Sequence, residues 1–192
     1  MNRPGVSSSE HTSLGVAYML GEGVPQDDAE AVKCFRLAAE QGDAYAQYRL
    51  GVMYGNGRGV PRSNAEVVTW VRKAAEQQYA PAQYLLGIAY EVGRVVPQDY
   101  EEAVRWYRMV AEQGDPDAQS NLGLMYGLGQ GVPQDYVQAH MWLNLAASRE
   151  SGALAKSYAE GRDVIAAKMT PEQISEAHRL AREWAPRTWE ES

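Results

Sequence analysis

The feature that most constrains this chain is a pattern of residues that recurs every 36 positions. Glycines at positions 15, 51, 87 and 123 each follow a leucine and precede a tyrosine by three residues. A further glycine, a Val-Pro pair and an alanine keep the same register in all four units. Self-similarity at a period of roughly 20–50 residues is typical of repeat arrays, in which each unit packs on its neighbours. The period predicts four stacked units: 8–43, 44–79, 80–115 and 116–151.

Each unit is predicted to form two helices. In the second unit, Ala46, Leu50, Gly51 and Tyr54 lie on one helical stripe, and this stripe defines the first helix, helix A. Glycine inside a helix costs about 1 kcal/mol relative to alanine, so we expect its repeated use to mark close approach of a neighbouring helix. Later glycines are expected to end helix A with positive φ, and the Val-Pro pair is expected to be extended.

The second helix, helix B, is predicted to begin at a capping residue. The expected N-caps are Asp27, Ser63, Asp99 and Asp135. Three residues later stand the carboxylate or amide side chains expected to complete a capping box: Glu30, Glu66, Glu102 and Gln138. The predicted buried stripe of the third unit is Ala103, Trp106, Tyr107, Val110 and Ala111. Cys34 stands at the tryptophan position of the first unit, where a small buried side chain is the favoured interpretation and a reactive thiol the alternative.

The two ends of the chain depart from the period. Residues 1–9 are polar and are predicted to be mobile, and residues 187–192 are predicted to form a tail. Residues 152–186 are predicted to form capping helices that cover the last apolar face of the array. One helix is expected over 152–169, with an interruption near Gly161 as an alternative. A capping box at 170–173 starts a last helix ending near Trp184, with an inward stripe of Ile174, Ala177, His178 and Ala181.

Composition excludes several classes of protein. The net charge is -7, which disfavours binding to nucleic acid or to an anionic membrane surface. A single cysteine excludes an intrachain disulfide framework. No apolar run is long enough to insert into a membrane, and the first ten residues do not have the pattern of a signal peptide. As the chain stands it is expected in the cytoplasm, or in the periplasm or outside the cell if a leader has been removed.

The pattern Ala-Gln-x-x-Leu-Gly-x-x-Tyr-x-x-Gly-x-Gly-Val-Pro-x-Asp, followed by Ala-x-x-Trp-Tyr-x-x-Ala-Ala-Glu-Gln-Gly, resembles the Sel-like repeat (SLR) family over residues 10–151. This family is related to tetratricopeptide repeats. The resemblance implies an all-α, right-handed α-solenoid of helix pairs with helix A on the concave side. It also implies a role as an adaptor or scaffold. The chain departs from the family pattern at Val95, which replaces a loop glycine, and at Gln78-Tyr79, which replace Gly-Asp.

The sequence contains no arrangement typical of catalysis. It has no Gly-x-Ser-x-Gly, Ser-x-x-Lys, phosphate-binding loop or His-Glu-x-x-His motif, so we expect no enzyme activity and no cofactor. His11, His140 and His178 are far apart in sequence and are predicted on different helices, which disfavours a metal site. His140 is expected to face solvent or a neighbouring helix.

The candidate site is the concave face of the helices A, where residues vary between units. By analogy with tetratricopeptide grooves, the predicted peptide-binding residues are Tyr45, Tyr48, Asn56, Tyr84, Glu91 and Ser120. Tyrosine suits such a surface because a rigid apolar ring carries a polar tip. In the alternative interpretation, Tyr48 and Tyr84 only pack between neighbouring helices. Val52, Ile88 and Leu124 are expected to belong to the core.

These observations favour a non-enzymatic adaptor that holds a peptide or protein segment in its groove, with self-association as another use of the same face. Two alternatives stay open. One is an accessory β-lactam-binding hydrolase of the kind reported for some SLR relatives, although the cysteine pairs of that subgroup are absent here. The other is a structural spacer, or an inhibitor of the product of a neighbouring gene.

Overall fold

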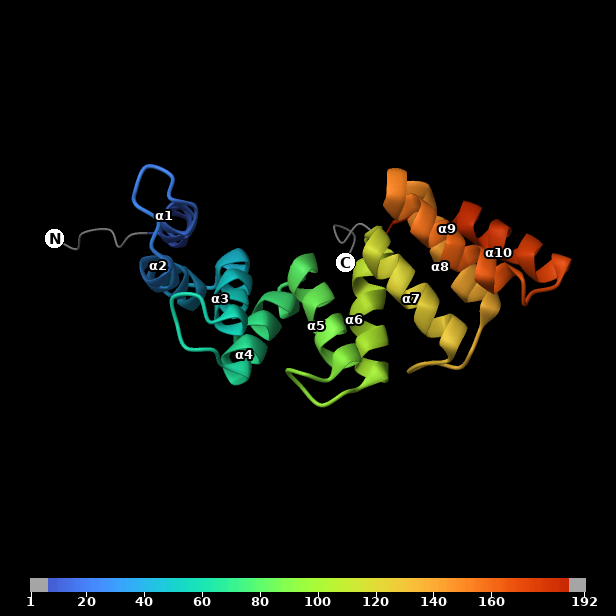
Figure 1. Cartoon of the computed structure of the whole chain (residues 1–192), viewed down its shortest axis with the longest axis horizontal. Helices are drawn as coiled ribbons and strands as arrows, with labels where there is room; N and C mark the ends of the chain where they lie inside the picture. Colours follow the sequence, from blue (N-terminus) through green and yellow to red (C-terminus); the bar gives the residue numbers. More distant parts are fainter. Residues whose placement is uncertain (1–6, 187–192) are drawn as a thin grey trace. The chain divides into compact units, whose positions relative to one another are not determined.

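The computed structural model describes residues 7–186, which form ten helices and no strand (Figure 1). The helices are α1 Ser8–Leu20, α2 Asp28–Glu40, α3 Ala44–Asn56, α4 Asn64–Glu76, α5 Ala80–Val92, α6 Tyr100–Glu112, α7 Pro116–Leu128, α8 Tyr136–Arg149, α9 Gly152–Ala166 and α10 Pro171–Glu183. Helices α1, α3, α5 and α7 are the predicted helices A, and α2, α4, α6 and α8 are the helices B. The predicted all-α solenoid of helix pairs is confirmed.

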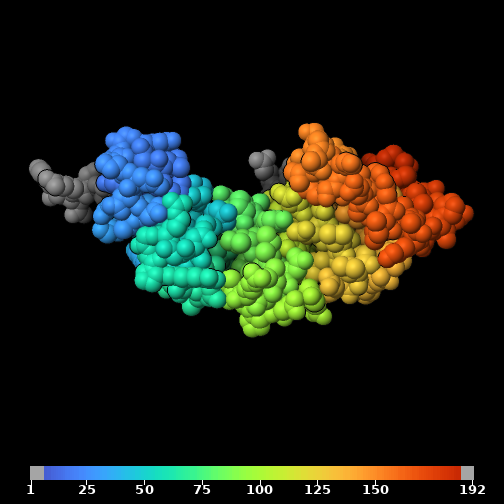
Figure 2. Space-filling view, viewed as in Figure 1, coloured from blue at the N-terminus to red at the C-terminus, as the bar shows by residue number. Residues whose placement is uncertain are grey.

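The described chain divides into two compact units. The first holds residues 7–89 and 93–97, and the second holds residues 90–92 and 98–186. In the first unit α1 packs on α2, α2 on α3 and α3 on α4, and these helices form the continuous blue to teal surface of Figure 2. In the second unit α6 packs on α7, α7 on α8, and α8 on both α9 and α10.

The central glycines of helix A mark close helix contacts, as predicted. A Cβ atom on Gly51 would lie 2.6 Å from Cγ2 of Val71, and one on Gly123 would lie 3.0 Å from the carbonyl oxygen of Ala139. On Gly15 it would lie 2.9 Å from the ring of Phe35. Separations below about 3.4 Å force the neighbouring atoms to shift, so only glycine lets the two helices of a pair pack at this distance.

The predicted N-caps of helix B are confirmed, but the predicted capping boxes are only half present. The side chains of Asp27, Ser63, Asp99 and Asp135 all accept hydrogen bonds from amides of the first helical turn. The reciprocal bond to the cap amide is absent, because that amide already donates to the carbonyl of the repeated tyrosine in helix A. These pairs are Asp27 to Tyr18, Ser63 to Tyr54, Asp99 to Tyr90 and Asp135 to Tyr126, at 2.9–3.2 Å. The freed glutamates find other partners; Glu66, for example, accepts from the indole nitrogen of Trp70.

Buried glutamines join one repeat to the next. In the Ala-Gln pair of helix A, Nε2 of Gln47, Gln83 and Gln119 donates to a carbonyl at the end of the preceding helix B, at 3.1–3.2 Å. The acceptors are Ala39, Ala75 and Ala111. All three glutamines are buried. Each bond adds a side-chain donor to a carbonyl that already accepts from a backbone amide three residues later, that of Gly42, Gln78 or Gly114.

The C-terminal segment forms the predicted pair of capping helices. Helix α9 continues through Gly161 without interruption, and Thr170 and Gln173 form the predicted capping box at the start of α10. Ala177 is fully buried, whereas His178 is exposed, so His178 was wrongly included in the inward stripe. Beyond α10, the ring of Trp184 packs on Trp142 with centroids 6.1 Å apart. The predicted tail 187–192 lies outside the described residues.

Two further predictions need correction. Ser7–Ser9, predicted to be mobile, form the cap and first turn of α1, because Ser7 and Glu10 make a capping box; residues 1–6 lie outside the description. Trp106 is only half-buried, whereas Tyr107 beside it is fully buried and donates to Glu91 at 2.5 Å. Cys34 is buried, and burial raises the pKa of its thiol, which agrees with the small buried side chain that was predicted.

Candidate functional site

Three tyrosines of the first compact unit meet at the N-terminal end of α3. The ring of Tyr79 lies 6.4 Å from that of Tyr45 and 5.5 Å from that of Tyr48, measured between centroids. Tyr45 also meets Phe35 of α2 edge-on at 6.3 Å. All three tyrosines are half-buried. We call them the tyrosine cluster. Tyr45 and Tyr48 were predicted site residues, whereas Tyr79 was not.

Tyr79 reaches this cluster at a cost to local stability. The other junctions use glycine and aspartate: Gly42 and Gly114 adopt positive φ, and Asp43 and Asp115 cap the next helix. Here Gln78 takes the same backbone conformation with φ 63°, and Tyr79 caps α5 without a side-chain hydrogen bond. A non-glycine residue in this region and a missing cap each cost about 1 kcal/mol. Local strain of this kind is a pointer to function.

Arg49 lies one helical turn from Tyr45. Its guanidinium lies over the Tyr45 ring at 5.9 Å, and one terminal nitrogen contacts the sulfur of Met19 in α1. Its Nε atom is buried without a hydrogen-bond partner. The corresponding residues of the other units are Ser13, Leu85 and Asn121, which carry no charge. This exception to the repeat is the signal by which sequence comparison between units could have found Arg49.

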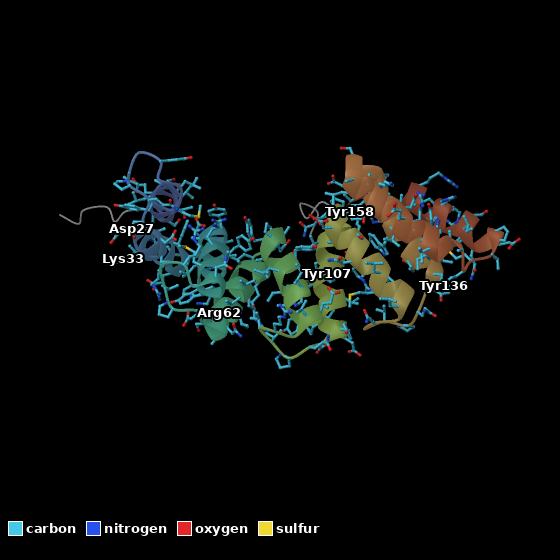
Figure 3. The ribbon with its side chains drawn as sticks, in the orientation of Figure 1. Asp27, Lys33, Arg62, Tyr107, Tyr136 and Tyr158 are labelled. Atoms are coloured by element: carbon cyan, nitrogen blue, oxygen red, sulfur yellow. The ribbon has the colours of Figure 1, made fainter. Side chains whose placement is uncertain are left out.

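A cleft of about 190 Å³ opens at the other end of α3, toward the loop at 93–97. Its lining includes Val52 and Asn56 of α3, Leu85 of α5, Val95 of the loop, and Arg62, which Figure 3 labels near the start of α4. We call it the α3–α5 cleft. Tyr45, Arg49, Val52 and Asn56 are spaced to share one helix face, so the tyrosine cluster and the cleft lie along the same side of α3.

The cleft coincides with the predicted departure at Val95. The loop glycines of the second and fourth repeats, Gly59 and Gly131, have positive φ and lie close to the preceding helix B. A Cβ atom on Gly59 would lie 2.2 Å from the Asp28 carbonyl oxygen, and one on Gly131 would lie 2.1 Å from the Tyr100 carbonyl oxygen. Val95 has no positive φ. Since a branched side chain does not fit where a Cβ already clashes, the third loop packs differently, and Asn64 donates to the Arg94 carbonyl at 3.3 Å.

Of the remaining predicted residues, Glu91 and Ser120 are less suited to binding than Tyr84. Tyr84 is half-buried on α5. In the second compact unit, the Glu91 carboxylate already accepts a hydrogen bond from the Tyr107 hydroxyl, and the Ser120 side chain is only 7% exposed. Val52 and Ile88 are half-buried, but Leu124 is 43% exposed, so its assignment to the core was wrong. The exposure of a side chain on helix A depends on the helices that pack against it. The sequence pattern of a single repeat does not predict this exposure.

The structure brings together two histidines that the sequence separates. His140 of α8 is 2% exposed and its ring lies 5.1 Å from that of His178 of α10. Its Nδ1 atom has no partner, and burial followed by the charges of His178 and Arg162 lowers its pKa to about 4. Residues 7–186 contain no group of three or more metal-ligating side chains and no helix long and apolar enough to cross a membrane.

A protein-family model matches most of the chain. The model of the Sel1 repeat matches residues 11–43, 44–79, 80–115 and 116–151. The chain belongs to the Sel1 repeat family. Members of this family are commonly scaffolds for protein interactions, and the all-helical Sel1 fold is typically non-enzymatic.

Solved structures extend the Sel1 relationship. A protective antigen of uropathogenic Escherichia coli with an SLR fold is 35% identical, with a TM-score of 0.78 over 92% of this chain, which spans 37% of the length of that protein. A Sel1 repeat protein from Oxalobacter formigenes is 30% identical, with a TM-score of 0.77 over 92% of this chain and 71% of its own. The cysteine-rich protein B of Helicobacter pylori shares the fold at 22% identity, with a TM-score of 0.53 over 71% of this chain and 98% of its own.

Proposed function

We propose that this Sel1 repeat protein is a non-enzymatic adaptor. It binds an extended peptide segment along the helix A face of its first compact unit, residues 7–89 and 93–97. The observation that carries the proposal is the convergence of unit-specific residues on one side of α3. The tyrosine cluster, Arg49 and several residues that line the α3–α5 cleft, such as Asn56 and Val95, stand at positions where the second or third repeat differs from the others. Residues that maintain a solenoid recur in every unit, whereas residues that select a partner need not.

The chemistry of this face suits a peptide. Half-buried tyrosine rings offer rigid apolar contact at low entropic cost, and their hydroxyls and Asn56 offer hydrogen bonds. Tyr45, Tyr48, Asn56 and Tyr84 therefore remain in the proposed site. Glu91 and Ser120 are left out, because one is engaged by Tyr107 and the other is buried.

Selection of random 12-residue peptides displayed on phage, with the full chain immobilised, tests this proposal. We expect peptides to be enriched, and Tyr48→Thr, which installs the residue of the first unit at this position, to weaken their binding at least about tenfold. The control is Leu154→Gln, which changes an exposed apolar residue of α9 and should leave binding unchanged.

Two results would overturn the proposal. One is a failure of any peptide to be enriched on the folded chain. The other is full retention of binding by Tyr48→Thr together with a large fall in its melting temperature, which would show that Tyr48 only packs between helices. Turnover of nitrocefin above that of a heat-inactivated sample would instead favour the hydrolase alternative.

A further inference from the structure

We propose that Arg49 and the tyrosine cluster receive an acidic side chain, aspartate or glutamate, of an extended peptide, and that an aliphatic side chain of the same peptide enters the α3–α5 cleft. This inference rests on the proposed function, and it adds the chemistry of the partner to it. We expect the ligand to be an internal segment of a protein rather than a free small molecule. The two subsites are separate positions on one helix, and a peptide can reach both of them at once.

Arg49 has an unmet need for a negative charge. A guanidinium has five N–H donors and no acceptor, so its hydrogen bonds must go to acceptors nearby. Within residues 7–186 its close partners are the Met19 sulfur and the face of Tyr45, and none of the ion pairs includes it. A buried N–H without an acceptor, such as its Nε, destabilises the protein in the absence of a partner.

The carboxylate at the start of α3 does not meet this need. Asp43 Oδ2 accepts from the Thr12 hydroxyl at 3.0 Å, and Oδ1 accepts from the Ala46 amide at 2.8 Å as the helix cap. Both oxygens of Asp43 are therefore already engaged in holding α1 and α3. No ion pair joins Asp43 or another described carboxylate to Arg49, so its guanidinium is available to a carboxylate of a bound peptide.

A carboxylate fits better than a phosphate. A phosphomonoester carries a charge of about −1.5 to −2 and is typically held by clusters of arginines or by helix N-termini. Arg49 is one cation that lies over a single aromatic ring, that of Tyr45, which matches the single charge and planar shape of a carboxylate. Burial raises the pKa of the Tyr79 hydroxyl, so this hydroxyl stays protonated and is available as a second donor.

The length of the face indicates how the two subsites are spaced. Seven residues separate Arg49 from Asn56, which places them about 10 Å apart along the axis of α3. A peptide in the extended polyproline II conformation rises about 3.1 Å per residue and presents every third side chain on the same face, so an acidic and an aliphatic residue three positions apart would reach both subsites. Because the face continues past Arg49 toward the cleft, a side chain within a segment fits better than the carboxylate that ends a chain.

A pair of matched peptides tests this inference. A peptide selected on the full chain is synthesised with an amidated C-terminus, so that only side chains supply carboxylates, and its acidic residue is changed to the corresponding amide. Isothermal titration with the wild type should show at least about tenfold tighter binding of the acidic form, as expected for one charged hydrogen-bonded pair. Arg49→Met, which keeps the apolar stem, should bind the acidic and amide forms equally.

The results that overturn the inference differ from those that overturn the proposed function. Equal binding of both peptides by the wild type, or a preference that persists in Arg49→Met, refutes the acidic subsite while peptide binding itself stands. Binding only by peptides with a free C-terminal carboxylate also refutes it. If no peptide is enriched, both proposals fail. Should Arg49→Met not fold, Arg49→Ser, which installs the residue of the first unit, gives the same comparison.

Discussion

Arg49 and Tyr79 are single residues that break the repeat, and the proposed peptide recognition rests on them. The position of Arg49 is uncharged in the other three units, and the position of Tyr79 holds a capping aspartate at the junctions before and after it. The sequence identified Tyr45 and Tyr48 as candidates because they vary on the helix A face. It did not identify Tyr79, because a junction residue has no place in a helical stripe, and only the fold brings its ring between the other two.

The repeated glycines give a prediction at the same scale. Gly123→Ala should lower the free energy of unfolding by about 1–3 kcal/mol, because the new methyl would meet the backbone of α8, which cannot yield as a flexible side chain can. Urea denaturation followed by circular dichroism measures this change.

Gly161→Ala is the matched control, since it also replaces a glycine inside a helix. Its Cβ would lie 3.5 Å from the nearest side-chain atom, that of Leu143, so there is room for it. We expect it to stabilise the protein by up to about 1 kcal/mol through helix propensity alone. Equal effects of the two substitutions would contradict the close-packing role of Gly123.

At the scale of helices, the sequence predicted which elements form but not all of the bonds that join them. Caps and terminating glycines are local, so the starts of α2, α4, α6 and α8 and the ends of α1, α3, α5 and α7 followed from the residues present. The reciprocal half of the capping box did not form, because the Tyr18, Tyr54, Tyr90 and Tyr126 carbonyls already accept from the cap amides. The buried glutamines also had no assigned role, since their acceptors lie on a preceding helix.

The glutamine joints can be tested at Gln119. Gln119→Leu keeps an apolar side chain of similar length but removes the bond to the Ala111 carbonyl, which closes the end of α6 against α7. We expect the free energy of unfolding to fall by about 0.5–1.5 kcal/mol, the usual net contribution of one hydrogen bond, because the Ala111 carbonyl keeps its bond from the Gly114 amide. A thermal midpoint equal to that of the wild type would show that solvent replaces the bond.

The packing of α10 on α8 is predicted to depend on pH through His140. The folded-state pKa of His140, about 4, lies below the ordinary histidine value of 6.5, so the unfolded chain binds more protons between these values. Stability is therefore full above about pH 6.5 and falls as the pH drops toward 4, by up to about 3 kcal/mol for a shift of this size. The groups that face His140 are His178 on α10 and Arg162 and Asp163 on α9.

His140→Val isolates this effect, because Val32, Val68 and Val104 occupy the same position in the other units. Urea unfolding of the wild type and the variant between pH 7.5 and 4 should give curves that differ increasingly toward acid, with the variant losing less stability. Parallel curves would show that other groups, such as the capping carboxylates, account for all of the acid sensitivity.

At the scale of the whole molecule, the period of 36 residues dictated the fold almost completely, because each repeat is stabilised by neighbours of the same design. The candidate site followed only in part. It arises where the repeat is broken, and the consequences of a broken repeat depend on the neighbouring unit. Val95 illustrates this: the sequence showed that it replaces a loop glycine, but the cleft that opens there is bounded by residues of α3, α4 and α5.

We propose that the junction at residues 78–79 is less stable than the other repeat junctions because it places Tyr79 in a binding surface. Gln78→Gly restores the glycine of the other junctions and should raise the free energy of unfolding by about 1 kcal/mol while retaining peptide binding. The double variant Gln78→Gly with Tyr79→Asp also restores the helix cap, which offsets the lost ring contacts. It should be at least as stable as the wild type.

The most direct test is therefore to measure melting temperature and peptide affinity together for the wild type, Gln78→Gly and the double variant. The account predicts that the double variant melts no lower than the wild type yet binds a selected peptide at least about tenfold more weakly, while Gln78→Gly binds it normally. Undiminished binding by the stable double variant would contradict the account, because Tyr79 would then be only a packing residue of the repeat junction.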